Sequence, residues 1–273
     1  MVKINSIDDL FALGILGDFG DGHYVILPEG TKILNALYAL LEKYLTKPLQ
    51  FEEVVLPKMA PVSAFETAEI LGKWDDYLLS AVPFSKTRGV ETPYILDPLQ
   101  CTVFYEFLRE KKVDSIRWYD RSGPTYRNED CDTIIPGIKQ REFHRAEFMY
   151  IGKPDEVSSL RKDGLSQLER LCSDLRLQHR IVDGTGCYQF DSDSRVSIRD
   201  LEIYIPFLDT WLEVVGCSVL GNNLTNKFHI QASDDNELWS GCIGIGMERL
   251  LVSVLSYHGT NALTQIQEAL ACQ

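Results

Sequence analysis

The stretch SGCIGIGMERLLVSV near the end of the chain combines a thiol, alternating glycines and an arginine in a way that suits ligand binding. If its first half is a strand, side chains two apart share a face, so Cys242, Gly244 and Gly246 lie on one side. The glycines then leave room for a planar ligand against the backbone. A helix that begins near Met247 would place Arg249 beside free backbone amides that attract phosphate. A tightly packed core strand fits the same pattern.

A second stretch, QREFHRAEF, carries ionisable side chains in a strand-like context. As a strand, it places an aromatic ring, two arginines and a carboxylate on one face: Arg141, Phe143, Arg145 and Glu147. Upstream, YRNED places Arg127 and Glu129 together in the same way. Such a face is costly to bury without a partner. It suits a nucleotide, because a ring stacks on the base, arginines hold phosphates and carboxylates hold magnesium or amines. The competing interpretation is a salt-bridged outer face of a sheet.

The rest of the chain predicts the elements that must position these residues. Apolar spacing predicts helices over residues 28–45, 100–112 and 155–177, and a short strand that ends at Pro57. Stretches with alternating, β-branched or aromatic residues predict further strands over 125–130, 140–152, 197–207, 210–219 and 238–247. Helices come early and strands late, which favours an α+β fold with a mostly antiparallel sheet. GIGMER is therefore not interpreted as a dinucleotide-binding GxGxxG motif.

Composition narrows the class of protein. The chain has 27 basic and 40 acidic residues, a net charge of −13, which argues against broad electrostatic capture of nucleic acid. Residues 109–121 form the densest basic run and are the candidate for a local basic patch, but a solvated helix face with a short loop is the favoured interpretation. The start lacks the order of a secretory signal, and no apolar run reaches the ~20 residues that span a bilayer. Seven cysteines without a CxxC pair favour a cytoplasmic protein with reduced thiols and no membrane partner.

Three stretches together resemble a known family. YRNE followed by REFHRAE resembles motif 2 of the class II aminoacyl-tRNA synthetases, GIGMER resembles motif 3, and FEEVVLP after a long helix resembles motif 1. They follow the family's order, at about residues 30–57, 125–151 and 240–254. The resemblance implies a single catalytic domain over residues 1–273, with a mostly antiparallel sheet flanked by helices. It also implies a homodimer, since motif 1 pairs two subunits in that class.

The subfamily that these stretches resemble uses zinc. EFHRAEFMYIG and SGCIGIGMER resemble the methanogen-type seryl-tRNA synthetases and their homologues, the amino acid:[carrier protein] ligases. In that group two cysteines and a glutamate hold a zinc ion, and the matching positions here are Cys101 in DPLQC, Glu147 and Cys242. Three protein ligands leave one coordination position open. In this family the substrate's amino group takes that position, which implies a role for the thiol among the glycines.

The resemblance also implies a reaction: ATP-driven activation of a small amino acid as an aminoacyl-adenylate. Arg127 and Arg249 are the expected catalytic residues, on the α-phosphate and the terminal phosphate. The other expected nucleotide and magnesium contacts are Glu129, Lys139, Phe143, Glu213 and Gly246. Two departures are visible: Lys139 stands where the family has a loop arginine, and the segment after Glu213 lacks the seryl Ser-Ser-Cys-Ser-Asn run. Glycine, alanine and serine are the family's usual substrates.

The acceptor of the activated amino acid is inferred from the same family. Seryl enzymes of this type carry a large N-terminal tRNA-binding domain, and this chain begins almost at motif 1. We therefore expect no tRNA-binding domain, no tRNA partner, and transfer to the phosphopantetheine thiol of a carrier protein. The alternative is a truncated seryl-tRNA synthetase-like enzyme that aminoacylates tRNA or another nucleophile. A non-catalytic amino-acid-binding paralogue is a third interpretation, but such proteins usually lose the arginines that Arg127 and Arg249 represent.

Overall fold

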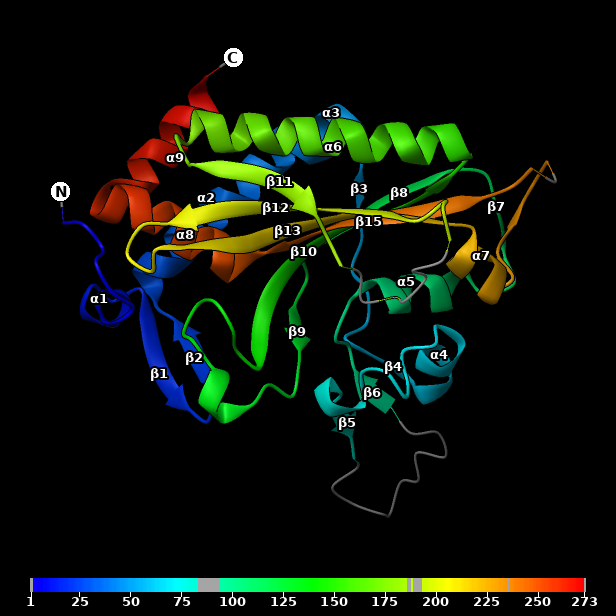
Figure 1. Cartoon of the computed structure of the whole chain (residues 1–273), viewed down its shortest axis with the longest axis horizontal. Helices are drawn as coiled ribbons and strands as arrows, with labels where there is room; N and C mark the ends of the chain where they lie inside the picture. The colour runs from blue at the N-terminus through cyan, green and yellow to red at the C-terminus, as the bar shows by residue number, and fades with distance from the viewer. Residues whose placement is uncertain (1, 83–93, 186–187, 189–192, 235, 273) are drawn as a thin grey trace.

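A long sheet crosses the molecule, with helices on both of its faces (Figure 1). The computed structural model describes residues 2–82, 94–185, 188, 193–234 and 236–272. The strands of this sheet are β3 (Glu52–Glu53), β8 (Ile116–Asp120), β9 (Pro124–Tyr126), β10 (Glu142–Gly152), β11 (His179–Asp183), β12 (Ser197–Ile205), β13 (Thr210–Gly221) and β15 (Trp239–Gly246). They follow the order β11, β12, β13, β15, β10, β8, β3, with β9 joined to β10. Only β3 and β8 pair in parallel, which confirms the predicted antiparallel α+β class.

Smaller sheets extend this framework. The hairpin of β1 (Leu16–Gly20) and β2 (His23–Ile26) lies before the first long helix. A three-stranded sheet consists of β4 (Met59–Pro61), β5 (Ser80–Ala81) and β6 (Tyr94–Leu96), and a two-stranded one of β7 (Lys112–Val113) and β14 (Gln231–Ala232). A short turn follows β6 and leads into helix α5 (Cys101–Leu108).

The helices divide between the two faces of the sheet, and each face has its own apolar core. One core includes residues of α2 (Pro28–Leu41), π-helical η1 (Glu42–Thr46), α3 (Lys47–Leu49), α6 (Pro154–Asp174), α8 (Met247–His258) and α9 (Ala262–Ala271). The other includes residues of α4 (Val62–Thr67), α5 (Cys101–Leu108) and α7 (Asn223–Lys227). The remaining short helices are α1 (Asp8–Ala12) and the 3-10 turns η2 (Asp75–Tyr77), η3 (Cys131–Thr133) and η4 (Gly259–Asn261). Across the described ranges, no helix has the length and apolar character needed to cross a membrane.

Strand β15 has the two faces that its alternation predicts. Ile243 and Ile245 lie fully buried in the core beneath α6 and α8, whereas Cys242 lies in the core beside α5. Period-two alternation therefore separates the apolar side chains from the thiol. Helix α8 begins at Met247, as expected, immediately after Gly246.

Four predicted elements differ from the structure. The helix expected over 100–112 ends at Leu108, and Lys112 belongs to strand β7. The helix expected over 28–45 begins at Pro28, whose fixed φ suits the first turn, but its last part becomes the π-helical η1. The strand before Pro57 is only the two residues of β3. The strand expected over 125–130 ends at Tyr126. Arg127 N–H still bonds to the carbonyl of Arg141, just before β10, but Asn128 N–H bonds to the carbonyl of Tyr77, so the ladder does not continue to residue 130.

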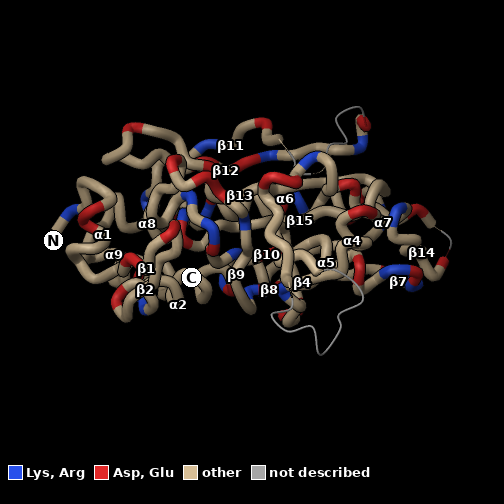
Figure 2. The backbone as a smooth tube through the Cα atoms, turned by 90° about the horizontal axis from the view of Figure 1, so that it is seen from below, with Lys and Arg blue, Asp and Glu red and all other residues tan. Residues whose placement is uncertain are grey.

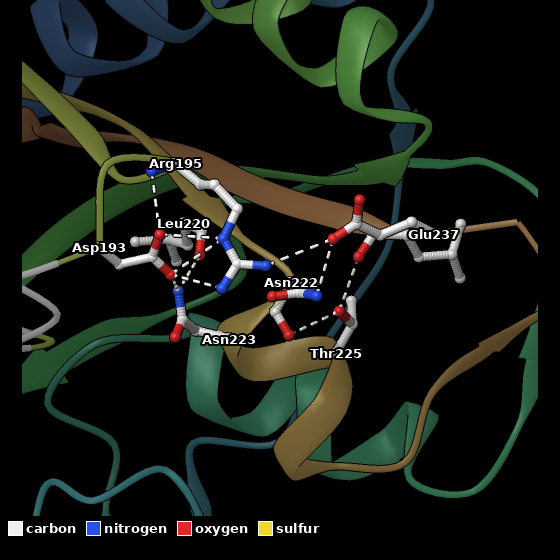
Figure 3. A network of polar contacts seen from close by, with 8 residues as sticks. Asp193, Arg195, Leu220, Asn222, Asn223, Thr225 and Glu237 are labelled. Atoms are coloured by element: carbon white, nitrogen blue, oxygen red, sulfur yellow. Dashed lines mark hydrogen bonds and ion pairs between the residues drawn. The ribbon is translucent and has the colours of Figure 1, made fainter.

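A polar network holds the far end of β13 and the adjoining helix α7 (Figure 3). The Arg195 guanidinium donates to both carboxylate oxygens of Asp193 and reaches Glu237 at 3.4 Å. Asn223 Nδ2 donates to Asp193 and to the carbonyl of Leu220. These hydrogen bonds hold the pKa of Asp193 well below its usual range. The network ties the start of β12 to the end of β13 beside the site described below.

Substituting Gly241 with alanine tests the close packing at the sheet centre. A Cβ there would overlap the carbonyl oxygen of Ser218 and the ring of Tyr150, and Ser218 O is backbone that cannot move aside. We expect Gly241→Ala to lower the free energy of unfolding by about 1–3 kcal/mol, as overpacked cores do. Urea denaturation measures this. Gly17→Ala is the control, since its Cβ would meet Leu27 only at 3.6 Å or more; equal losses in both variants would contradict the packing argument.

Candidate active site

Cys101, Glu147 and Cys242 meet in the structure although they are far apart in sequence. One ligand atom of each lies within 4.8 Å of the other two. On the sheet, Glu147 pairs with Gly244, so Cys242 is its diagonal neighbour on the same face, a spacing that lets side chains touch. Cys101 is the first residue of α5, which packs over that face. All three expected metal ligands are therefore brought together.

The environment of this triad favours a bound cation. Glu147 is fully buried, and burial raises the pKa of its carboxyl well above the usual range, while nearby Arg145 acts in the opposite direction. Arg145 Nε lies 2.5 Å from Glu147 Oε2, yet neither Glu147 oxygen has a well-aligned hydrogen bond within the described residues. Hydrogen bonds, first from Cys101 and then from Ser218, lower the pKa of the Cys242 thiol to about 6. A thiolate, a second thiol and a carboxylate form a donor set that fits zinc.

A cavity of about 620 Å³ opens beside the triad, on the same face of the sheet. All seven residues expected to contact the nucleotide or its magnesium line it: Arg127, Glu129, Lys139, Phe143, Glu213, Gly246 and Arg249. They come from β10, β13, β15, α8 and the segment between β9 and β10. Arg145 and Gly244, which the strand faces already suggested, also line it, and sequence reasoning missed the remaining lining residues: Gly137, Ile138, Gln140, Val214, Gly216 and Glu248.

Arg127 lies between two aromatic rings at this cavity. Its guanidinium carbon is 5.2 Å from the ring centre of Trp74 and 5.3 Å from that of Phe143. Arg127 Nε donates to the carbonyl of Pro98 at 3.4 Å. A planar cation sandwiched in this way is attracted by both ring faces. Although Arg127 lies outside any strand, these contacts aim it into the cavity.

Ion pairs hold the other charged side chains of the cavity. Lys139 Nζ lies 3.2 Å from Glu129 Oε2, and it also donates to Thr133. Arg249 Nε donates to the carbonyl of Ile138 at 2.9 Å, and Nη1 donates to the carbonyl of Glu213 at 2.7 Å. Both cations therefore bridge neighbouring segments of the cavity wall.

The two glycines of β15 serve different purposes. We expected both to leave room for a planar ligand, and for Gly244 this is wrong in detail: an added Cβ would overlap the Arg145 guanidinium, so Gly244 accommodates that side chain. At Gly246 the nearest atom to an added Cβ would be Arg249 Cδ at 3.4 Å, an ordinary contact. Because Gly244 has no side chain, the Arg145 side chain can lie against β15 and reach Glu147, two residues along on β10.

A second cavity, of about 770 Å³, adjoins the first. Both are lined by Arg127, Arg145, Glu213 and Gly216. The second cavity reaches Cys242 of the triad and is also lined by Trp74, Leu99, Thr185, Tyr188, Ile198, Asp200, Ser218 and Leu220. Alternation along β13 places Gly216, Ser218 and Leu220 on this face, a signal that was available in the sequence. The contribution of Trp74 and Leu99, from separate loops, was not.

Asp200 is the unusual carboxylate of this second cavity. It forms no ion pair with any described residue, and a Cβ on Gly216 would lie 3.6 Å from its Oδ1 and 3.9 Å from Glu213 Oε1. Burial, followed by the negative charges of Glu213 and Glu202, raises the pKa of Asp200 to about 7. Ionising a carboxyl group whose pKa is raised in this way lowers the free energy of unfolding.

Comparisons with known proteins agree with this arrangement. The family model described as tRNA synthetase class II core domain (G, H, P, S and T) matches residues 84–258. Type-2 serine–tRNA ligases of Methanopyrus kandleri and Methanocaldococcus jannaschii are 25% and 24% identical, over 88% and 89% of this chain and 54% of each relative. The chain thus spans about half the length of these relatives.

Two solved structures share the fold. M. kandleri SerRS, in complex with A. aeolicus tRNASec, has a TM-score of 0.85 at 24% identity, covering 94% of this chain and 58% of that one. Giardia lamblia prolyl-tRNA synthetase in complex with prolyl-adenylate has a TM-score of 0.79 at 18% identity, covering 93% and 53%. The mainly antiparallel sheet flanked by helices is the fold common to all three chains.

Asp200 generates a pH-dependent prediction. An unfolded aspartate titrates near pH 4, and the folded pKa is about 7. A raised carboxyl pKa means that the folded state becomes less stable, relative to the unfolded one, as pH rises from 4 to 7. Asp200→Asn should therefore raise the free energy of unfolding at pH 8 and have little effect at pH 4. Urea denaturation at both pH values measures this, with exposed Asp163→Asn as control; a gain that is independent of pH would contradict it.

Proposed function

The chain belongs to the class II tRNA synthetase core family, and from that premise we propose that it activates a small amino acid with ATP as an aminoacyl-adenylate. The observation that carries the proposal is the pair of adjoining cavities, which share Arg127, Arg145, Glu213 and Gly216. ATP would occupy the first cavity and the amino acid the second. The reacting carboxylate and α-phosphate would then meet at the shared wall.

The proposed reaction needs positioning more than covalent assistance. A carboxylate oxygen of the amino acid attacks the α-phosphorus, the bond from that phosphorus to the bridging oxygen breaks, and pyrophosphate leaves with the electron pair. No proton has to move. Arg127, at the wall between the cavities, would contact both the carboxylate and the α-phosphate. Orientation and charge stabilisation of this kind supply large parts of enzymatic rate enhancements.

The remaining nucleotide contacts follow from the positions of the lining residues. Phe143 would stack on the adenine, and Glu129 would accept a hydrogen bond from its amino group. Arg249 would hold the terminal phosphate near the first turn of α8, with the backbone of Gly246 beside it. Lys139 would contact phosphate as a point charge rather than a bidentate fork. Glu129 and Lys139 pair with each other at 3.2 Å, so ATP bound in this way would have to separate them.

Two metal ions belong to the proposal. Cys101, Glu147 and Cys242 would hold zinc, and Glu213 would hold magnesium against the phosphates. A bound zinc ion would bind and orient the substrate's amino group through its open coordination position. This zinc dependence is supported by the geometry of the triad and by the depressed pKa of Cys242. Serine is the first amino acid to test, because both named relatives are serine–tRNA ligases.

For the acceptor we propose tRNA or a related nucleophile. The relatives named above are tRNA ligases, which supports this acceptor over the carrier protein expected from the sequence. In the view of Figure 2, basic and acidic segments are interspersed along the described backbone. In the run from 109 to 121, Arg109 pairs with Glu106, and Arg121 pairs with Glu42 and Glu53. A carrier protein thiol remains the competing acceptor in the experiment below.

We also propose that two copies pair through the surface near α2 and the β1–β2 hairpin. Large apolar side chains are exposed there: Phe19 is 77% exposed and Val25 45%, and Val55 beside β3 is 78% exposed. Phe19 and Val25 line one hollow together with Thr31 and Leu34 of α2, and exposed apolar side chains that gather at one surface indicate an interaction site. The predicted motif 1, at about residues 30–57, includes most of α2 and Val55.

Amino-acid-dependent ATP–pyrophosphate exchange tests the proposed function. We expect exchange with serine, glycine or alanine that requires zinc. Cys242→Ala should reduce the exchange at least 100-fold, because the amino group loses the metal that positions it. Cys172→Ala is the matched control: it removes a buried thiol from α6 in the opposite core and should leave exchange unchanged.

A second experiment, which starts from the adenylate, identifies the acceptor. Preformed adenylate is offered to tRNA and to a phosphopantetheinylated carrier protein in parallel. Transfer to tRNA supports the proposed acceptor, and transfer only to the carrier thiol replaces it. Absence of exchange with every amino acid, in protein that binds zinc and ATP, would contradict the proposed activation.

A further inference from the structure

The turn between β6 and α5 connects the two parts of the site. It consists of the sequence Asp97-Pro98-Leu99-Gln100 and leads directly into Cys101 of the triad. Leu99 lines the second cavity. Asp97 is fully buried but belongs neither to the triad nor to either cavity. A buried carboxylate outside the described chemistry calls for a physical role.

The Asp97 side chain holds the turn closed. Its Oδ1 accepts the backbone N–H of Leu99 at 3.2 Å and that of Gln100 at 2.9 Å. This is the pattern by which aspartate stabilises a turn that follows it. Asp97 Oδ2 makes no hydrogen bond with any described residue. Only one of the two carboxylate oxygens is therefore used to hold the turn.

The turn requires such support because its last residue is strained. Gln100 is fully buried and has a φ of 56°, a left-handed value that non-glycine residues rarely adopt. Conformations of this kind persist only where the surroundings fix them. The hydrogen bond from the Gln100 amide to Asp97 is one such constraint, and it lies one residue before the thiol ligand. Losing it would let the start of α5 shift.

The same turn also accepts hydrogen bonds from the segment that carries Arg127 of the first cavity. The carbonyl of Asp97 accepts the backbone N–H of Tyr126 at 3.0 Å, and the carbonyl of Pro98 accepts Arg127 Nε at 3.4 Å. On its other side, Asp97 N–H donates to the carbonyl of Lys58 at 3.0 Å. The turn is thus tied to the segment that carries Arg127 by one backbone contact and one side-chain contact.

We propose that Asp97 is a positioning residue of the activation reaction: the turn that its carboxylate closes fixes Cys101 of the metal triad and Arg127 of the nucleotide cavity relative to each other. This inference rests on the proposed function, because it gives Asp97 a role through those two residues. It predicts that one substitution, at a residue that is no metal ligand and lines neither cavity, weakens the binding of metal and of nucleotide together.

Three substitutions at Asp97 separate the turn from its charge. Asp97→Asn keeps the Oδ1 acceptor, Asp97→Ser offers a weaker one, and Asp97→Ala removes it. Zinc affinity is measured by competition with a chromophoric chelator, and ATP affinity by calorimetry on zinc-loaded protein. We expect Asp97→Asn to stay within about threefold of wild type in both affinities. Asp97→Ala should lose at least about tenfold in zinc affinity, as outer-shell substitutions do, together with weaker ATP binding, and Asp97→Ser should lie between.

A stability control and a spectrum distinguish positioning from general destabilisation. Tyr44→Phe removes a buried hydrogen bond to Asp174 in the opposite core, and should lower stability without changing either affinity. In cobalt-substituted protein, Asp97→Ala should alter the thiolate-to-cobalt absorption, and Asp97→Asn should preserve it. If the alanine variant does not fold, the asparagine and serine variants still provide the comparison.

Two results would overturn the inference. Wild-type zinc and ATP affinities in Asp97→Ala would make Asp97 merely structural. A loss in Asp97→Asn as large as in Asp97→Ala would assign the effect to charge rather than to the turn. Because both readouts are binding measurements, they remain decisive even if wild-type protein shows no pyrophosphate exchange, a result that would contradict the proposed function alone.

Discussion

The burial of Glu147 at the centre of the sheet is the constraint on which the rest of the site depends. A fully buried carboxylate, whose pKa burial raises, is costly to ionise, and two thiols within 4.8 Å do not relieve that cost by themselves. Arg145 supplies one positive charge, and it reaches Glu147 only because Gly244 has no side chain. A zinc ion would supply the rest, since thiolate and carboxylate are ligands that it prefers. The metal hypothesis therefore follows from electrostatics as well as from resemblance.

The register of the strands determines which side chains lie around the buried Glu147. The pairing of Glu147 with Gly244 places Cys242 diagonally beside the carboxylate, and Cys217 of β13 faces away into the opposite core. Period-two alternation along β13 then exposes Gly216 and Ser218 to the second cavity. The sheet thus forms one continuous wall along the triad and both cavities. Helix α8 adds Arg249 at the end of that wall.

The sequence predicts the parts of the site that depend on local pattern. The faces of β15 and the start of α8 at Met247 follow from the alternation of residue types, and the resemblance to class II synthetases implied the seven nucleotide-contact candidates that line one cavity. Sequence patterns do not predict side chains whose positions depend on contacts with distant loops. Arg127 keeps one backbone hydrogen bond to Arg141 at the end of the ladder, but its side chain is placed by the carbonyl of Pro98 and the ring of Trp74, which come from other segments. The turn at Asp97 and the raised pKa of Asp200 likewise depend on neighbours that no sequence window contains.

The central claim is that the buried triad is a zinc site, and zinc-edge X-ray absorption on purified protein tests it most directly. We expect one zinc per chain, with two sulfur ligands at about 2.3 Å and with light atoms as the remaining ligands at about 2.0–2.2 Å. Cys101→Ser should then reduce the sulfur count to one. Protein that binds no stoichiometric zinc, or zinc bound entirely by nitrogen and oxygen, would contradict the claim.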